Sequence, residues 1–257
     1  MIHSTAIIHS SARLGRDLHI GAYAVIDAEV EIGDGCEIGH HAVIEGPTRL
    51  GRDNRIFPHA CLGMAPQDIG YRGEPTRLEI GERNVIREFV TLHRASTKEQ
   101  WVTRVGNDNL FMVSSHVAHD CIVGDHVIMA NAATLAGHVT VGDYVNISGL
   151  CAVHQFVRIG ASVMLGGGTM VPLDIAPFVM AHGNPAKLYG LNLRGLQRRG
   201  FSMAEIRQLK RAYKLLFHSE LRLEEAMAAV QAEEGLDSPH VAYLLDFLRT
   251  SKRGVNR

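Results

Sequence analysis

The chain has 257 residues, with 26 Lys plus Arg, 27 Asp plus Glu and a formal net charge of −1 at pH 7. This balance gives no support for binding to nucleic acid or another polyanion. No stretch approaches the roughly eighteen apolar residues of a membrane span. The N-terminus lacks the basic and apolar regions of a secretory signal, so we expect a cytoplasmic protein without a transmembrane segment.

Apolar residues recur every six positions. Each sixth residue from Ile2 to Leu62 is Ile or Leu, and each sixth residue from Val105 to Val171 is apolar. Helices and open sheets repeat every ~3.6 and ~2 residues, so neither explains this period. The pattern is typical of a solenoid in which each flat face of a coil takes one short strand and one turn.

Three faces make a coil of 18 residues, so side chains 18 positions apart should stack roughly 4.8 Å apart. One predicted column of inward residues is Val117, Leu135 and Val153. A histidine follows each of them within three residues: His119, His138 and His154. With His116 just upstream, the sequence predicts four histidines near one corner of the coil.

Two segments interrupt the repeat and are predicted to be extruded loops. Residues 63–79 carry Pro, Gly and charge, whereas residues 93–104 shift the phase by one residue and hold the only tryptophan, Trp101. Loops on a regular scaffold often carry function. If the first loop adds twelve residues and the second adds seven to otherwise regular coils of 18 residues, Leu62 lies on the same face as Val117. The first loop then emerges on the side of the predicted histidines.

The repeat ends near Pro177, after which the periodicity becomes helical. We expect a β-helical domain over residues 1–190 and a helical domain over residues 191–257. Ser202 to Glu205 form a capping-box pattern at the start of one helix. Two further amphipathic stretches follow, Leu223 to Glu234 and Pro239 to Ser251. Helices over one end of a β-helix also protect its unpaired strand edges.

The four cysteines fit neither a disulfide framework nor a CxxC metal pair. Cys36, Cys121 and Cys151 each follow an inward position by four residues, in a slot that elsewhere holds alanine. We expect them to be small core side chains rather than nucleophiles, although Cys121 lies near the histidines.

The histidine cluster suggests either a metal or acid–base chemistry. His116 and His119 are three residues apart, which in extended chain puts their side chains on opposite sides, so we do not expect them to be paired ligands. Three histidines from neighbouring coils could still hold zinc, as in the β-helical carbonic anhydrases.

Acid–base chemistry is the preferred interpretation, because histidine titrates near neutrality and can remove a proton from a hydroxyl without a cofactor. Asp120 could fix the tautomer of His119, although adjacent side chains often point apart. Gly137 offers a backbone N–H suited to an oxyanion. A base and an oxyanion donor are the minimum equipment for moving an acyl group onto an alcohol or amine.

Several motifs in combination resemble those of UDP-N-acetylglucosamine 3-O-acyltransferases. They are the hexad repeat, the loop Gln67-Asp68-x-x-Tyr-x-Gly-Glu-Pro-Thr-Arg, and then His-x-x-His-Asp-Cys, Leu-Ala-Gly-His-Val, Ala-Val-His-Gln-Phe and Gly-Leu-x-Arg-Arg-Gly-Phe-Ser. The resemblance covers essentially the whole chain. It implies a mainly β fold, a left-handed parallel β-helix of hexapeptide repeats with a C-terminal α-helical domain. Left-handed crossovers depart from the usual rule that connections between parallel strands are right-handed. The resemblance also implies a homotrimer with active sites between subunits and the first step of lipid A synthesis.

The resemblance assigns roles to individual residues. His119 matches the catalytic base, with Asp120 beside it and the Gly137 N–H as oxyanion donor. The positions matched to substrate binding are His116, His138 and His154 in the sugar and acyl pocket, Gln67 and Asp68 in the loop, and Gln155, Asn192, Arg198 and Arg199 on the acyl donor or the uridine diphosphate. His119 would take the proton from the glucosamine 3-hydroxyl, which attacks a (R)-3-hydroxyacyl thioester on acyl carrier protein, with no metal or other cofactor.

This chain departs from the family pattern at two positions. Many members carry lysine where it has Gly70, and many carry an acidic residue where it has Arg194. A cation lost in the loop and one gained at the junction are expected to change how the nucleotide-sugar is held. Separately, a 3-amino sugar remains open as the acceptor, which would give an amide product. Gly167 matches a position that acts as an acyl-length ruler, and glycine there predicts a long acyl chain, the alternative being a simple turn.

Other classes remain as alternatives. The related N-acyltransferase that acts later in the pathway has an additional N-terminal uridine-binding domain, for which a repeat beginning at Ile2 leaves no room. A metalloenzyme of the carbonic anhydrase type is the next alternative. A purely structural β-helix would need neither clustered histidines nor two extruded loops.

Overall fold

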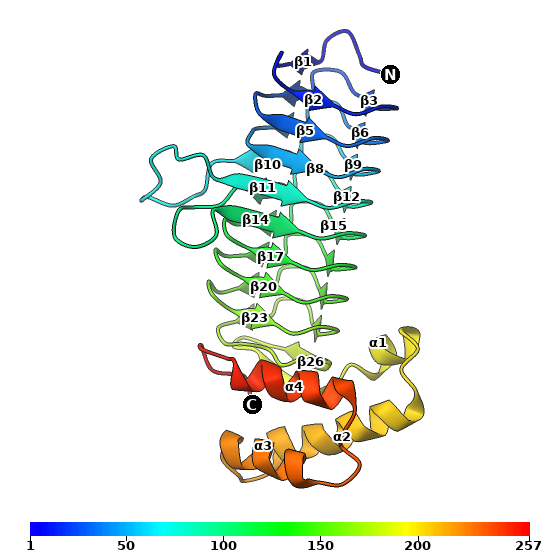
Figure 1. Cartoon of the computed structure of the whole chain (residues 1–257), viewed down its shortest axis with the longest axis vertical. Helices are drawn as coiled ribbons and strands as arrows, with labels where there is room; N and C mark the ends of the chain where they lie inside the picture. Colours follow the sequence, from blue (N-terminus) through cyan, green and yellow to red (C-terminus); the bar gives the residue numbers. More distant parts are fainter.

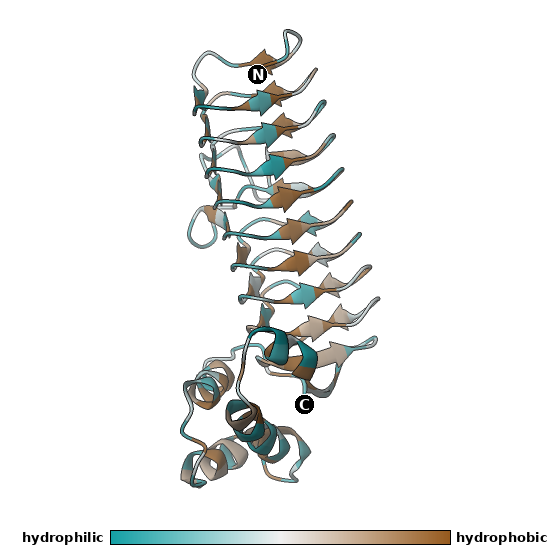
Figure 2. Cartoon of the chain, turned by 90° about the vertical axis from the view of Figure 1, so that its right-hand side faces the viewer, coloured by the Kyte–Doolittle hydropathy of each residue, from teal (hydrophilic) through white to brown (hydrophobic).

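The computed structural model describes residues 1–257 and shows a parallel β-helix with helices at its C-terminal end (Figure 1). The coil is left-handed, as predicted. Most strands have two residues and stack into three sheets along the axis. Figure 2 shows apolar residues on many of the strands and more polar ones in the connections between them.

The first sheet contains the predicted histidine column. Its strands, in spatial order, are β1 (Ile7–Ile8), β4 (Val25–Ile26), β7 (Val43–Ile44), β10 (Cys61–Met64), β13 (Thr91–His93), β16 (His116–Val117), β19 (Thr134–Leu135), β22 (Ala152–Val153) and β25 (Met170–Val171). Leu135 pairs with both Val117 and Val153, which confirms the 18-residue column. Leu92 pairs with both Leu62 and Val117, so the first loop leaves the coil on the histidine side, as predicted.

The second sheet is also entirely parallel. Its strands are β2 (Arg13–Leu14), β5 (Val30–Ile32), β8 (Thr48–Leu50), β11 (Arg77–Ile80), β14 (Val102–Val105), β17 (Ile122–Val123), β20 (Thr140–Val141) and β23 (Arg158–Ile159). Its outer face carries ion pairs between neighbouring coils, for example Arg104 with Glu79 and Arg13 with Glu31.

The third sheet ends in a hairpin. Its strands are β3 (His19–Ile20), β6 (Glu37–Ile38), β9 (Arg55–Ile56), β12 (Val85–Ile86), β15 (Leu110–Phe111), β18 (Ile128–Met129), β21 (Asn146–Ile147), β24 (Met164–Leu165), β26 (Val179–His182) and β27 (Lys187–Leu191). The β26–β27 pair is antiparallel, and its turn is the Gly-Asn-Pro-Ala segment after His182. The hexad pattern does not predict this reversal.

The core is one continuous stack of inward side chains. The second residue of a two-residue strand points inward, and examples such as Phe111, Leu135 and Ile147 are fully buried. Cys36, Cys121 and Cys151 are buried as predicted. Burial raises the pKa of the Cys121 thiol to about 12. The thiolate that a nucleophile requires is therefore disfavoured at Cys121.

Two loops project from one side of the coil (Figure 1). The first loop comprises residues 65–76 between β10 and β11, and the second comprises residues 94–101 between β13 and β14. Strand pairing extends into both segments that the sequence marked as loops, because β11 begins at Arg77 and β14 begins at Val102.

Four helices follow the last strand: α1 (Leu193–Arg198), α2 (Met203–His218), α3 (Leu223–Ala232) and α4 (Pro239–Arg249). The predicted capping box is present at the start of α2: the Glu205 N–H donates to the Ser202 hydroxyl, and the Ser202 N–H donates to the Glu205 carboxylate. α4 lies against the last coil, where Phe247 packs under the Arg158 guanidinium at 4.4 Å. None of these helices has the length and apolar character needed to cross a bilayer.

Candidate active site

His119 and Asp120 form a hydrogen-bonded pair at the corner between the first and second sheets. His119 Nδ1 lies 2.8 Å from Asp120 Oδ2. The left-handed backbone of Asp120, with φ of 60°, turns the chain there, so two adjacent side chains meet instead of diverging as in a strand. An ionised carboxylate only accepts hydrogen bonds, so Nδ1 carries the proton and Nε2 keeps a lone pair. His119 is thereby oriented as a base.

Asp120 is 5% exposed and is held as a carboxylate. Burial acts to raise its pKa, but hydrogen bonds from His119 and Ser96 outweigh this and hold the pKa below its usual value. Oδ2 accepts from the Ser96 hydroxyl at 2.6 Å and from the Ser96 amide at 2.9 Å.

Gly137 lies directly against the His119 ring on the next coil. A Cβ at this position would lie 2.5 Å from His119 Cε1 and 2.8 Å from Nε2, so only glycine fits without moving the ring. The Gly137 N–H donates to no acceptor within the chain. A free backbone donor therefore lies in the residue that contacts the base.

His138 occupies the same corner one coil further. Its Nε2 lies 3.7 Å from Asp120 Oδ2, and its Nδ1 lies 3.3 Å from Glu99 Oε2. The ring stacks on Phe156 at 4.4 Å and meets the edge of the His119 ring at 5.2 Å. The structure thus brings His119, Asp120 and His138 together as predicted.

His116 lies on the outer face of the first sheet. Its Nδ1 is 2.6 Å from the Thr91 hydroxyl, and its ring meets that of His93 at 4.9 Å. Burial, with help from the neighbouring histidines, lowers the pKa of His93 to about 4. Burial also lowers the pKa of His116. Both rings are therefore neutral at pH 7.

The two loops meet at Asp68. Lys98 Nζ lies 2.7 Å from Asp68 Oδ2, and the Gly70 N–H donates to Asp68 Oδ1 at 2.8 Å. The hydrogen bond from Lys98 is the main cause that holds the pKa of Asp68 below its usual value. Arg94 joins the loops again by donating to the Tyr71 hydroxyl. The second loop thus supplies a cation to Asp68 through Lys98. The first loop supplies none at Gly70, the position that matches lysine in many members of the family that the chain resembles. Gln67 is exposed.

Other predicted site residues lie apart from this group. His154 and Gln155 are exposed two coils beyond His119. There the Arg253 guanidinium donates to His154 Nδ1 at 2.8 Å. Asn192 caps α1, and its amide donates to Ser162 O at 2.9 Å. The Arg199 guanidinium covers the Tyr144 ring at 3.7 Å, at the corner between the second and third sheets.

One chain therefore does not bring Asn192, Arg198 and Arg199 together with His119, because these groups belong to different corners of the coil. Arg198 is exposed without a side-chain partner. Gly167 is exposed at the remaining corner, between β24 and β25.

Ligand atoms of His119, Asp120 and His138 lie within 4.8 Å of one another, close enough to share a metal ion. The hydrogen bonds favour another use. Asp120 Oδ2 already accepts from Ser96 and from His119 Nδ1, so metal binding through these atoms would require breaking those bonds. The arrangement is better suited to proton transfer.

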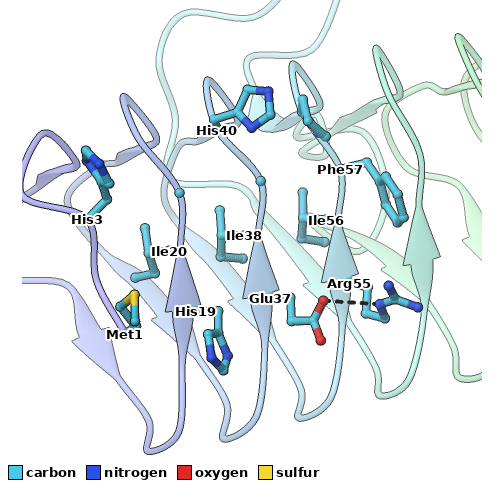
Figure 3. A pocket seen from close by; sticks show the side chains of 13 residues that line it. Met1, His3, His19, Ile20, Glu37, Ile38, His40, Arg55, Ile56 and Phe57 are labelled. Atoms are coloured by element: carbon cyan, nitrogen blue, oxygen red, sulfur yellow. Dashed lines mark hydrogen bonds and ion pairs between the residues drawn. The ribbon is translucent and has the colours of Figure 1, made fainter.

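A cavity of about 550 Å³ adjoins the histidine corner; its lining includes Glu99, His138, Phe156, Arg158, Lys252 and Arg253. A second cavity, of about 420 Å³, lies on the third sheet near the N-terminus (Figure 3). Figure 3 shows Glu37 paired with Arg55 there, at 3.3 Å. That cavity contains none of the predicted site residues.

Sequence reasoning missed Ser96, Lys98 and Glu99, each of which contacts a predicted site residue. All three lie in the second loop, where no periodicity indicates what a side chain contacts. His93 was also missed, although a signal existed. It directly follows Leu92, and Leu92 lies in the same column as Val117.

Comparison with known proteins gives consistent matches. A family model described as Udp N-acetylglucosamine O-acyltransferase, Domain 2, matches residues 174–256, and one described as bacterial transferase hexapeptide (six repeats) matches residues 11–46. Curated relatives named acyl-(acyl-carrier-protein)–UDP-N-acetylglucosamine O-acyltransferase include proteins of Herminiimonas arsenicoxydans, 54% identical, and Thiobacillus denitrificans, 55% identical. Each match covers 100% of this chain and 99% of the relative.

Solved structures agree over the full length. LpxA, a UDP-N-acetylglucosamine acyltransferase from Bacteroides fragilis, has a TM-score of 0.98 at 40% identity and covers 100% of both chains. LpxA from Acinetobacter baumannii has a TM-score of 0.97 at 44% identity, over 100% of this chain and 99% of the other. The chain therefore belongs to the family of acyl-(acyl-carrier-protein)–UDP-N-acetylglucosamine O-acyltransferases.

Proposed function

We propose that the chain transfers a (R)-3-hydroxyacyl group from acyl carrier protein to the glucosamine 3-hydroxyl of UDP-N-acetylglucosamine, the first step of lipid A biosynthesis. The observation that carries this proposal is the His119–Asp120 pair with Gly137 against its ring. It combines an oriented base with a free backbone donor, as acyl transfer requires.

In the proposed mechanism, His119 Nε2 takes the proton of the sugar 3-hydroxyl while the oxygen attacks the thioester carbonyl. Asp120 holds the proton on Nδ1 and stabilises the imidazolium that forms. The Gly137 N–H donates to the oxyanion of the tetrahedral intermediate. Collapse of the intermediate breaks the carbon–sulfur bond, and the thiolate of the carrier takes the proton from His119. Atoms and charge balance without a metal or other cofactor.

The neighbouring residues are proposed to hold the substrates. His138 meets the edge of the His119 ring, and Gln67, Asp68, His116 and His138 are proposed to offer polar contacts to the sugar. The neutral state of His116 at pH 7 suits a hydrogen-bonding role rather than a charge. Lys98 is positioned to supply the cation that Gly70 does not.

The separation of the corners supports a homotrimer with shared active sites. Asn192, Arg198 and Arg199 match positions that hold the acyl donor or the uridine diphosphate, yet within one chain they lie at another corner from His119. His154 and Gln155 are exposed and available to the same ligands. A second copy would supply the missing groups, as an interface between identical chains allows.

Gly167 is proposed to leave the acyl groove open for a long chain. A Cβ there would meet only Gly149 O, at 3.7 Å, so the space beside it is free. Between Gly167 and the base, the outer face of the first sheet carries small or apolar side chains, including Ala152 and Met170.

Two other activities remain to be distinguished. A 3-amino analogue of the sugar would accept the same acyl group at the same base. The geometry of His119, Asp120 and His138 also permits a zinc site of the carbonic anhydrase kind.

The test is to incubate the purified protein with UDP-N-acetylglucosamine and 3-hydroxyacyl carrier proteins of ten to sixteen carbons, and to follow products by mass. We expect an ester product, with preference for a long acyl chain. A parallel incubation with the 3-amino analogue tests amide formation. Absence of product with both sugars, together with stoichiometric zinc in the purified protein, would contradict the proposal and favour the metalloenzyme.

A further inference from the structure

The second loop is attached to Asp120 at both of its ends. At the start of the loop, the Ser96 hydroxyl and amide both donate to Asp120 Oδ2, at 2.6 and 2.9 Å. Just after its end, Thr103 Oγ1 accepts from the Asp120 N–H at 2.8 Å. Ser96 and Thr103 are 2% and 0% exposed. The loop is thus anchored on the backbone and the side chain of the residue whose carboxylate orients the histidine.

One oxygen of the Asp120 carboxylate, Oδ2, accepts every hydrogen bond that this side chain makes. Oδ2 accepts from His119 Nδ1 and twice from Ser96, whereas Oδ1 is buried without any partner. Without the Ser96 hydroxyl, less would distinguish the two oxygens, and the carboxylate could rotate. The His119 ring takes its orientation from Oδ2, so any rotation would be passed to the base.

We propose that Ser96 is a positioning residue: it fixes Asp120 Oδ2 and through it the His119 base, which makes the second loop part of the catalytic apparatus. The inference rests on the proposed function, because it assumes that His119 acts as the base. Ser96 does not contact the ring itself; its hydroxyl donates to Asp120 Oδ2 and accepts from the Lys98 N–H at 3.4 Å.

The chain offers a matched control in the adjacent hydroxyl. Thr97 lies in the same loop, is exposed, and its side chain makes no hydrogen bond. Ser96→Ala and Thr97→Ala therefore remove neighbouring hydroxyls of which only one contacts Asp120. Ser96→Thr keeps a hydroxyl at the first position and should restore most of the activity.

The test is steady-state kinetics of Ser96→Ala, Ser96→Thr and Thr97→Ala, with the thermal midpoint of each. Loss of one hydrogen bond to a charged group predicts that kcat of Ser96→Ala falls about tenfold or more, with KM within about twofold. Ser96→Thr should stay within about threefold of the wild type, and Thr97→Ala should be unchanged.

A double-mutant cycle separates positioning from loop anchoring. If Ser96 acts through Asp120, Ser96→Ala causes no further loss of kcat in an Asp120→Ala background. An equal fold-loss in both backgrounds, or a Ser96→Ala variant with wild-type kcat, would overturn the inference.

An assay without substrate keeps the inference apart from the proposed function. With selectively ¹⁵N-labelled histidine, NMR should show a protected Nδ1 proton for His119 that is lost or broadened in Ser96→Ala and kept in Thr97→Ala. An unchanged Nδ1 signal in Ser96→Ala would overturn the inference even if no acyl transfer were found. An inactive wild-type enzyme with the expected NMR change would instead overturn the proposed function alone.

Discussion

Stacked aromatic and imidazole rings recur at the corners of this β-helix, and a comparison of two of these corners shows that only one has the features of an active site. The first, which we term the aromatic ladder, comprises Tyr23, His41, His59 and Phe89, stacked at 5.2, 5.2 and 5.1 Å. The second is the histidine corner of His119, His138 and Phe156. In both, most of these residues have the same left-handed backbone, because both corners are turns between successive strands of the β-helix.

The surroundings of the two corners differ. Tyr23 and Phe89 are 56% and 57% exposed, and no acidic group pairs with the rings of the aromatic ladder. At the histidine corner, Asp120 and His138 are buried, and residues of the second loop contact both. Repetition of the coil alone brings histidines together. A buried carboxylate, a close glycine and an anchored loop are what turn such a cluster into a candidate active site.

Among substitutions that keep both His119 and Asp120, the largest effect is expected at Gly137, which has no counterpart in the aromatic ladder. In Gly137→Ala the new Cβ displaces the His119 ring, and misplacement of a base by about 1 Å should lower kcat about 100-fold. The steady-state assay by product mass measures this. The His119→Ala, Gly137→Ala double variant should be no slower than His119→Ala alone. A kcat within threefold of the wild type would show that the ring tolerates displacement.

A subunit-mixing experiment tests whether two different corners form one site. Chains with His119→Ala should be inactive, as should chains with both Arg198→Ala and Arg199→Ala. After co-expression in equal amounts, random assembly should restore about a quarter of the wild-type activity, since each site takes its residues from two chains. If verified mixed oligomers recovered no activity, the active site would have to lie within one chain.

Gly167→Met should change acyl-chain preference rather than abolish activity. Its side chain would enter the space beside Gly149 O and shorten the groove. We expect kcat/KM to shift about tenfold or more toward shorter donors, from the loss of contacts of several methylenes. Competition between carrier proteins of different acyl length measures the ratio. An unchanged preference would leave Gly167 as a simple turn.

The smallest expected effect is on stability, and it distinguishes the buried His93 from the exposed residues of the aromatic ladder. His93 has a folded pKa of about 4, below the unfolded value, so the unfolded state binds more protons between these values. Its contribution to stability is present above about pH 6.5 and is lost as the pH falls toward 4, by at most ~3 kcal/mol.

His93→Gln should therefore flatten the dependence of the unfolding free energy on pH between 7 and 4, and His41→Gln should not. Urea unfolding at fixed protein concentration measures both. Equal slopes in wild type and His93→Gln would contradict the burial argument.

The sequence was sufficient to predict the coil and much of the histidine corner. Strand positions follow from a local pattern repeated in each coil, and Val117, Leu135 and Val153 stack where counting puts them. His119 and His138 meet for the same reason. The antiparallel β26–β27 pair escaped prediction, since a reversal depends on the turn after His182 and not on the hexad.

The contacts of the two loops could not be predicted from the sequence for a different physical reason. Ser96 reaches Asp120 across 24 positions, and Lys98 reaches Asp68 in the other loop. Loops carry no periodicity, so their conformation depends on tertiary contacts that spacing does not encode. The pairing of His119 with Asp120 was anticipated from adjacency, but the left-handed turn that permits it is visible only in the structure.

The most direct test of the account compares two histidine variants in the same acyl-transfer assay. His119→Ala removes the proposed base, and His59→Ala removes an imidazole ring that stacks on His41 and Phe89 in the aromatic ladder. We predict that kcat falls by about two orders of magnitude or more in His119→Ala and stays within about twofold of wild type in His59→Ala. Equal activity of the two variants would contradict the assignment of His119 as the base.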